Sequence, residues 1–176
     1  MIILVVVIVT VINNVVLINA KIPSPSMEKT IMTGDRIFGF RLAYGINIDF
    51  FGHNYTKKFR DPERFDIVIF KYPDDERKLY IKRVIGLPGE TVQIMNETVY
   101  IDGVPLEEES LAHVSLSGLA DEPVVLGENE YFVLGDNRDS SEDSRFANIG
   151  NVKRGQIQGK VWFRILPLLK LDLIHS

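Results

Sequence analysis

The stretch LYIKRVIGLPGETVQIMNETVYI, residues 79–101, decides the fold class of this chain. It opens on a run of apolar and β-branched residues, 79–85, which is closed by the turn sequence GLPG. Two shorter runs, 91–95 and 98–101, flank Asn96-Glu97 like the arms of a β hairpin. Short runs of this composition, bounded by turn residues, are typical of antiparallel strands rather than helices.

The same period-two pattern continues on both sides of this stretch. We expect further strands over 65–70, 130–134 and 158–165. The segments 41–62 and 104–128 lack a clear pattern and are predicted to be long loops or insertions. The sequence therefore predicts a mainly β fold: an antiparallel, twisted, barrel-like β domain with an N-terminal transmembrane helix.

Composition places the chain among folded proteins and excludes several kinds of site. Its 176 residues are 45% hydrophobic and 25% charged, which suits one main domain. The net charge of −4 argues against binding along a nucleic-acid backbone. The absence of cysteine excludes disulfide frameworks, thiolate zinc sites and cysteine nucleophiles. We predict no nucleic-acid partner, no metal and no cofactor.

Residues 1–20, MIILVVVIVTVINNVVLINA, carry no charged side chain. A helix of about twenty residues spans about 30 Å, the thickness of the hydrocarbon core of a bilayer. We therefore predict a transmembrane anchor over 1–20 and a catalytic β domain over 21–176. Two alternatives remain: a cleaved secretory signal ending at Ala20, which would lack the usual basic start, and a buried core segment.

Two prolines stiffen the loop that follows this apolar segment. Residues 22–35 read IPSPSMEKTIMTGD, and Pro23 and Pro25 restrict the backbone around Ser24 and Ser26. Serines held in a stiff loop are candidates for a catalytic role, and the alternative is an ordinary Ser/Pro linker.

Lys82 lies inside a predicted strand, with Tyr80 and Val84 as its neighbours on the same face. Burial between such side chains lowers the pKa of a lysine, because it penalises the charged form. At an ordinary pKa near 10.4 only about one lysine in 2,500 is neutral at pH 7, and a decrease of about two units raises that fraction about a hundredfold. A neutral amine can accept a proton from a serine hydroxyl. The alternative is a lysine that extends to solvent beside Arg83.

The loop over 135–150, GDNRDSSEDSRFANIG, is dense in charged and hydroxyl groups. It does not fit a calcium loop, because counting from Asp139 places Ser144 at position six and Gly150 at position twelve. We interpret it as a buried network in which Asp–Arg pairs brace the loop and a hydroxyl orients a neighbouring group.

Taken together, these stretches resemble the type I signal peptidases. The resemblance is carried by Ser26-Met27, by the string KRVIGLPGE over 82–90, and by GDNRD over 135–139 with Ser141, Asp143, Ser144 and Arg145 after it. It implies a serine endopeptidase with a Ser–Lys dyad that removes N-terminal signal peptides from exported preproteins. It also implies a single-pass protein of the cytoplasmic membrane, with the catalytic domain on the extracytoplasmic side. The implied partners are preprotein signal peptides and the lipid membrane.

The resemblance also implies roles for individual residues. Ser26 is the implied nucleophile, Lys82 the general base, and Ser24 the hydroxyl that forms an oxyanion hole with the Ser26 backbone N–H. The resemblance implies that Ser141, Asp143 and Arg145 support the dyad, and that Asp136 and Arg138 give structural support. It also implies that Met27, Ile31, Tyr80 and Ile81 bind substrate. In the family, residues at these four positions line shallow pockets for small residues at P1 and P3. A Ser–Lys pair needs no histidine, and none of the motifs contains one.

One position departs from the family pattern. The family usually has proline where this chain has Lys29, and the substitution creates the spacing Ser26-x-x-Lys29, which is also a signature of penicillin-binding enzymes and serine β-lactamases. The other elements of that class are absent, because no Ser-Asp-Asn follows and Lys29-Thr30 precedes Ile31 instead of glycine. A non-catalytic, β-rich membrane protein that acts as a binding module is a further alternative, against which the retention of Ser26 and Lys82 argues.

Overall fold

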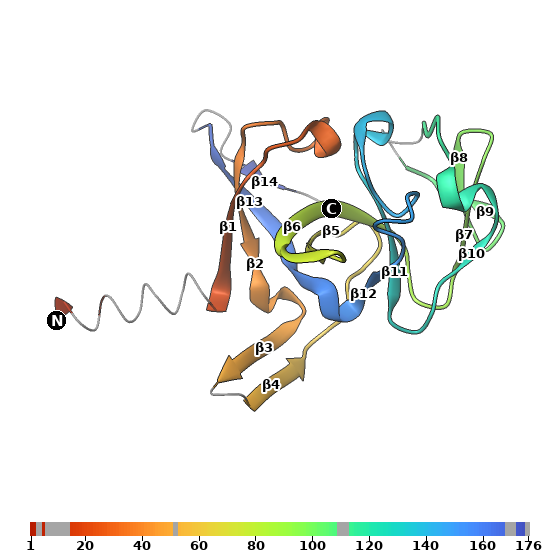
Figure 1. The fold of residues 1–176 in the computed structure, drawn as a ribbon. Helices are drawn as coiled ribbons and strands as arrows, with labels where there is room; N and C mark the ends of the chain where they lie inside the picture. The colour runs from red at the N-terminus through yellow and green to blue at the C-terminus, as the bar shows by residue number, and fades with distance from the viewer. Residues whose placement is uncertain (3–4, 6–14, 51–52, 109–112, 168–171, 175–176) are drawn as a thin grey trace.

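The computed structural model describes residues 1–2, 5, 15–50, 53–108, 113–167 and 172–174. In this part of the chain the strands form three sheets, and every strand pairing is antiparallel. Figure 1 shows the large sheet with a smaller sheet beside it and a two-stranded hairpin that projects away from both. The prediction of a mainly antiparallel β fold is confirmed.

The large sheet consists of β1 (Leu17–Lys21), β2 (Arg36–Phe40), β5 (Ile67–Tyr72), β6 (Asp75–Gly86), β11 (Glu130–Leu134), β12 (Val152–Lys153), β13 (Ile157–Leu166) and β14 (Asp172–Leu173). Within the described residues its strand order is β1-β2-β13-β5-β6-β11-β12, and β14 pairs with β13. At one end of this path β12 is two residues long and pairs with β11. The barrel-like shape of the domain stays a prediction.

Smaller elements surround this sheet. The second sheet contains β10 (Val124–Val125), β7 (Thr91–Met95), β8 (Thr98–Ile101) and β9 (Val104–Pro105), and the hairpin contains β3 (Gly45–Phe50) and β4 (His53–Lys58). Short 3-10 helices are η2 (Pro25–Met27), η3 (Arg41–Ala43), η4 (Gly118–Asp121), η5 (Arg138–Ser140) and η6 (Arg154–Gln156). The strands predicted over 91–95, 98–101 and 130–134 coincide with β7, β8 and β11.

The segment 41–62, predicted as a long loop or insertion, instead contains the β3–β4 hairpin. Its register runs from Gly45 opposite Lys58 to Phe50 opposite His53. The sequence of β4, HNYTKK, has no hydrophobic alternation, so the strand depends on backbone pairing with β3. In its described residues, 104–108 and 113–128, the other predicted loop contains the short elements β9, η4 and β10.

The predicted anchor over 1–20 lies mostly on residues 3–4 and 6–14, which are outside the described residues. Among the residues that are described, no helix has the length and apolar character needed to cross a bilayer. The end of the predicted anchor needs correction, since residues 17–20 belong to β1 and pair with β2. A run rich in β-branched residues suits a strand as well as a helix, and here Ile18 is buried in the core.

Buried apolar side chains attach the other parts of the fold to the large sheet. One cluster, which includes Ile85 and Phe132 from the large sheet and Val92 from the small one, joins the two sheets. Another cluster contains Met27 and Ile31 together with side chains of β1, β2, β5 and β13. This second cluster fixes the segment that carries Ser26.

Close backbone packing between β13 and β2 supplies a test of the fold. A Cβ at Gly159 would lie 2.6 Å from the Phe40 carbonyl oxygen, whereas one at Gly155 meets nothing within 4 Å. We expect Gly159→Ala to lower the free energy of unfolding by about 1–3 kcal/mol, as overpacking in a core does. Gly155→Ala is the matched control and should stay within about 0.5 kcal/mol of the wild type. Urea unfolding of both variants checks this, and equal stabilities would contradict the described packing.

Candidate active site

Ser26 sits in the short helix η2, in a position fixed from both sides. Pro25 occupies the first turn of η2, and the next residue, Met27, is only 1% exposed. The Ser26 carbonyl accepts a hydrogen bond from the Asn137 N–H at 3.1 Å, and the Asn137 amide donates to the Pro25 carbonyl at 3.1 Å. The loop over 135–150 therefore holds the backbone of Ser26 directly.

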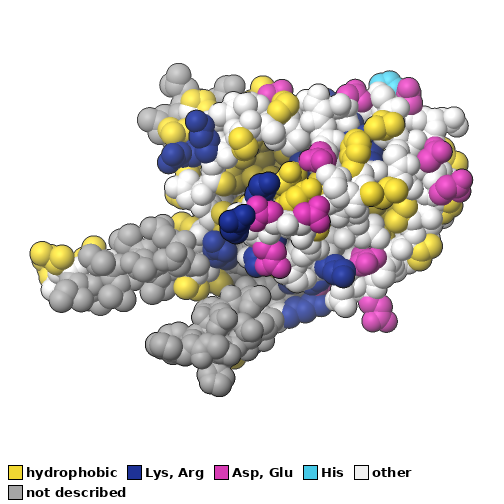
Figure 2. Space-filling model, viewed as in Figure 1, with side chains coloured by type: hydrophobic (Ala, Val, Ile, Leu, Met, Phe, Trp, Pro, Cys, Tyr) yellow, Lys and Arg dark blue, Asp and Glu magenta, His cyan; other side chains and the backbone are white. Residues whose placement is uncertain are grey.

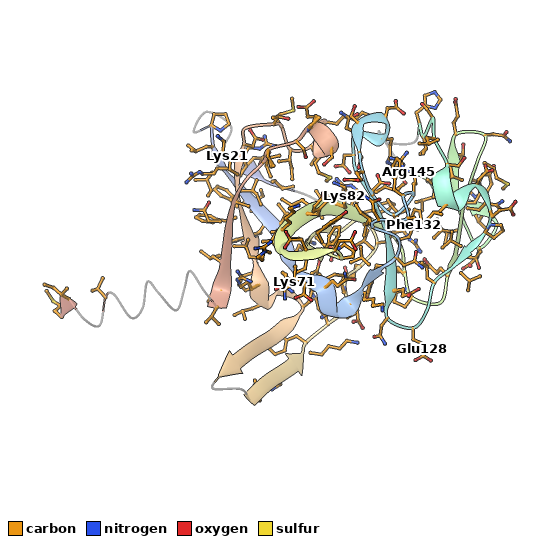
Figure 3. All side chains as sticks on the ribbon, viewed as in Figure 1. Lys21, Lys71, Lys82, Glu128, Phe132 and Arg145 are labelled. Carbon is orange, nitrogen blue, oxygen red and sulfur yellow. The ribbon has the colours of Figure 1, made fainter. Side chains whose placement is uncertain are left out.

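The structure brings Lys82 and Ser26 together from segments 56 positions apart in the sequence. The Lys82 amine Nζ lies 2.8 Å from the Ser26 hydroxyl oxygen Oγ. Its other hydrogen-bond partner is the backbone carbonyl of Ile81 at 3.1 Å, and the Tyr80 ring centroid lies 5.5 Å away. Figure 3 shows Lys82 near the centre of the molecule.

Burial of Lys82 has a direct electrostatic consequence. The residue is only 2% exposed. Burial lowers the pKa of Lys82 from 10.5 to about 8, while Asp143, Glu142 and Asp136 act in the opposite direction and Arg145 adds to the decrease. About one molecule in ten then carries a neutral Lys82 at pH 7. This amine can accept the proton of a hydroxyl within hydrogen-bond distance.

Two further serines lie near this pair. Ser24 is exposed, and its hydroxyl oxygen lies 3.3 Å from that of Ser26. Ser141 is buried, and its hydroxyl has no hydrogen-bond partner among the described residues. The dyad support that the resemblance implies for Ser141 stays a prediction. Gly135 makes room for Ser141, because a Cβ there would lie 2.1 Å from the Ser141 hydroxyl and 2.4 Å from the Ser26 carbonyl oxygen.

Two buried Asp–Arg pairs lie close enough to Lys82 to influence its pKa. Arg145 binds both carboxylate oxygens of Asp143, at 2.8 and 2.9 Å, and Asp143 also accepts the Gly135 N–H at 3.0 Å. The partner of Asp136 is Arg83, which binds both of its oxygens at 2.8 Å. Two-point pairs of this kind fix the orientation of both side chains.

The supporting network includes residues that sequence reasoning missed. Arg138, for which the resemblance implies structural support, forms a buried ion pair with Glu108 and donates to the Gly135 carbonyl. Thr30 donates a hydrogen bond to Asp136. Arg83 belongs to the motif KRVIGLPGE over 82–90, but no role was predicted for it. No sequence signal indicated Glu108, which lies in a segment predicted to be a loop.

A cleft of about 460 Å³ opens beside Ser26 and Lys82. Met27, Tyr80 and Ile81 line it, as the resemblance implies. Ile31 does not, because its side chain is fully buried in the core. Lining residues that were not predicted include Ile22, Ile69, Leu79 and Glu142. Figure 2 shows hydrophobic side chains gathered in a hollow near the middle of this face, with charged side chains around it.

Lys29 lies outside this arrangement. Its side chain is exposed, and its φ of 98° is in the left-handed region that favours glycine. It is the third residue of a turn closed by a hydrogen bond from the Thr30 N–H to the Met27 carbonyl at 3.1 Å. Proline, with φ fixed near about −65°, cannot adopt this conformation, so the loop differs from the one that the family's usual proline would form.

The described residues contain no group of three or more His, Cys, Asp or Glu side chains arranged to hold a metal ion. His113 pairs with Glu97 on the surface, away from the cleft. A serine hydroxyl within hydrogen-bond distance of a buried amine, beside an open cleft, is an arrangement that can support nucleophilic catalysis.

Comparison with known proteins identifies the family. The family described as "Signal peptidase, peptidase S26" matches residues 1–166, and the chain belongs to this family. A "Probable signal peptidase I-2" from Synechocystis sp. is 35% identical over 87% of this chain and 65% of its own length. A "Signal peptidase I" from Rickettsia bellii is 37% identical over 81% of this chain and 64% of its own length. The chain therefore spans slightly less than two thirds of the length of these relatives.

A solved signal peptidase I from Enterococcus faecalis V583 is also similar to this chain. It is 36% identical, and the match covers 58% of this chain and 98% of that one with a TM-score of 0.49.

The buried amine predicts how the reaction rate depends on pH. A pKa of about 8 for Lys82 means that its neutral form increases as the pH rises toward 8 and is nearly complete above 9. We expect kcat/KM for peptide cleavage to rise about tenfold per pH unit below this value and then to level off. Initial rates between pH 5 and 10 measure the profile. A rate that still rises about tenfold per pH unit at the upper end of this range would show that the pKa of Lys82 is not lowered.

Proposed function

We propose that this protein is a serine endopeptidase that removes N-terminal signal peptides from exported preproteins. The observation that carries the proposal is the 2.8 Å separation between the Lys82 amine and the Ser26 hydroxyl, at a lysine that is almost completely buried. Membership of the signal peptidase family supports the same reaction.

In the proposed mechanism Ser26 attacks the carbonyl carbon of the scissile bond, and its proton passes to neutral Lys82. Lys82 then donates that proton to the departing amine, which leaves an acyl-enzyme on Ser26. In the second half of the cycle Lys82 takes a proton from a water molecule, and the resulting hydroxide attacks the acyl-enzyme carbonyl. The bond to Ser26 breaks, and Lys82 returns the proton to the Ser26 oxygen. In this mechanism the Ser26 backbone N–H and the Ser24 hydroxyl would stabilise the oxyanion. The separation of 3.3 Å between the Ser24 and Ser26 hydroxyl oxygens supports a role for Ser24 close to the reacting atoms.

Substrate docks in this proposal as an extended strand beside β6. At residues 79–82 one edge of β6 pairs with β5, while the pairing with β11 begins only at Arg83. The other edge of β6 is thus open next to Lys82 in the described structure, and an added strand could use its backbone groups. The apolar side chains of Met27, Tyr80 and Ile81 would accept small residues at P1 and P3.

The proposal places the protein in the cytoplasmic membrane, with residues 1–20 containing the single anchor and the β domain on the extracytoplasmic side. Ala20 and Lys21 line the cleft, so the cleft begins where the apolar segment ends. Such an anchor would keep the cleft close to the membrane surface where signal peptides end, and so raise their effective concentration.

Exchange of each lysine separates this proposal from the penicillin-binding class. We expect Ser26→Ala and Lys82→Ala to abolish cleavage of a preprotein with alanine at P1, because they remove the nucleophile and the base. Lys29→Ala should keep most of the activity, since the Lys29 side chain is exposed. Activity lost only in the Lys29 variant, or acylation of Ser26 by a penicillin, would assign the protein to the other class. Cleavage that is independent of Ser26 would reject a serine mechanism.

The oxyanion role of Ser24 can be tested by itself. Loss of one oxyanion donor commonly lowers kcat by about 100- to 1,000-fold. We expect this decrease for Ser24→Ala with little change in KM, and partial recovery in Ser24→Thr, which keeps the hydroxyl. Steady-state kinetics of both variants measure the effect. A Ser24→Ala enzyme with wild-type kcat would remove Ser24 from the mechanism.

A further inference from the structure

Glu142 is an acidic side chain in the wall of the cleft. It follows the buried Ser141 and precedes the buried Asp143, yet it is itself exposed and lines the cleft together with Tyr80 and Lys82. Asp143 is neutralised by Arg145. Glu142 has no Lys, Arg or His partner within ion-pair distance in the described part of the chain.

Neutral donors fix the position of this carboxylate. The Tyr80 hydroxyl donates to one oxygen at 3.4 Å, and the Asn148 amide donates to the other. Tyr80 is held in turn by stacking on Tyr72, with ring centroids 4.9 Å apart. The negative charge is therefore oriented by the protein but not neutralised, which leaves it available to a charged group of the substrate.

The carboxylate lines the same cleft as the Lys82 amine and Ser26. Tyr80 connects the carboxylate with the amine, because its hydroxyl contacts Glu142 and its ring lies 5.5 Å from the Lys82 amine. The other charged lining residues besides Lys82 are Lys21 and Lys78, and the Lys78 amine has Asp75 at 3.9 Å. Glu142 is the one acidic residue among those that line the cleft in the described structure.

We propose that Glu142 determines specificity in this cleft, by favouring substrates that carry a lysine or arginine beside the scissile bond. This inference rests on the proposed function and names the class of preprotein that the site prefers. The favoured side chain belongs to a position other than P1 and P3, whose pockets are apolar. Attraction to Glu142 favours a basic residue, and repulsion disfavours an acidic one.

Matched peptide substrates test this inference in the full-length protein in detergent solution. Each peptide has alanine at P1 and P3 and a single Lys, Gln or Glu at P2, P1′ or P2′. At one or more of these positions we expect the wild type to cleave the Lys peptide about five- to tenfold faster, in kcat/KM, than the Glu peptide. The Lys-to-Glu ratio of kcat/KM should fall when the salt concentration is raised from about 0.1 to about 1 M, because salt screens the interaction between exposed charges.

Substitution at Glu142 should remove this preference. We expect Glu142→Gln to bring the Lys-to-Glu ratio within about twofold, and Glu142→Lys to reverse it. Glu128→Gln is the matched control, since it removes one negative charge from an exposed turn that Figure 3 shows far from Lys82. That variant should keep the wild-type ratio.

A second measurement separates an electrostatic role from a merely structural one. Burial and the guanidinium of Arg145 lower the pKa of Lys82, whereas the carboxylates of Asp143, Glu142 and Asp136 raise it. Loss of the Glu142 charge should therefore move the rising limb of the pH–rate profile to lower pH, whereas a purely structural defect would lower the rate at every pH.

The outcomes distinguish the two proposals. If the wild type cleaves the peptides through Ser26 but Glu142→Gln keeps the wild-type ratio, the specificity inference is wrong and the proposed function stands. If no peptide is cleaved, or cleavage is independent of Ser26, both the proposed function and the inference fail.

Discussion

Burial of one amine against one hydroxyl is the constraint on which the site depends. An ammonium group is costly to bury, and here the cost is reduced because Lys82 gives up its proton more readily than an ordinary lysine. Two nearby buried carboxylates, Asp143 and Asp136, act against this change. Each is bound at two points by an arginine, Asp143 by Arg145 and Asp136 by Arg83, and Arg145 itself acts in the same direction as burial.

The fold assembles this arrangement from distant segments. Ser26 comes from the short helix η2, which is anchored to the core through Met27, and Lys82 comes from the long strand β6. The loop after β11 contacts the backbone of Ser26 and supplies the carboxylates. The second sheet packs against the far end of β6, and Glu108, from the segment that follows β9, pairs with Arg138 in that loop. Packing of the second sheet and positioning of the site are thus connected.

Period-two patterning was sufficient to predict the hairpin over 91–101, because β7 and β8 bury every second residue. The central strands β5 and β11 are buried at consecutive positions, and short β-branched runs bounded by turn residues predicted them. Period-two patterning was insufficient for β4, whose polar sequence has no buried stripe, and for Leu17–Ala20, where an apolar run suits either secondary structure. In the site, the motifs pointed to Ser26, Lys82 and the Asp143–Arg145 pair, which the structure places together. The pairing of Asp136 with Arg83, the burial of Ile31 and the contribution of Glu108 depend on tertiary contacts that no local pattern encodes.

The most direct test of this account is to titrate the Lys82 amine itself. Lysine side chains labelled with ¹³C at Cε can be followed by NMR across the pH range, and the Lys82 signal can be assigned by its absence in Lys82→Ala. We expect the Lys82 signal to titrate near pH 8. If every lysine signal titrates near the ordinary value of 10.5, the amine is hydrated and cannot serve as the base for Ser26.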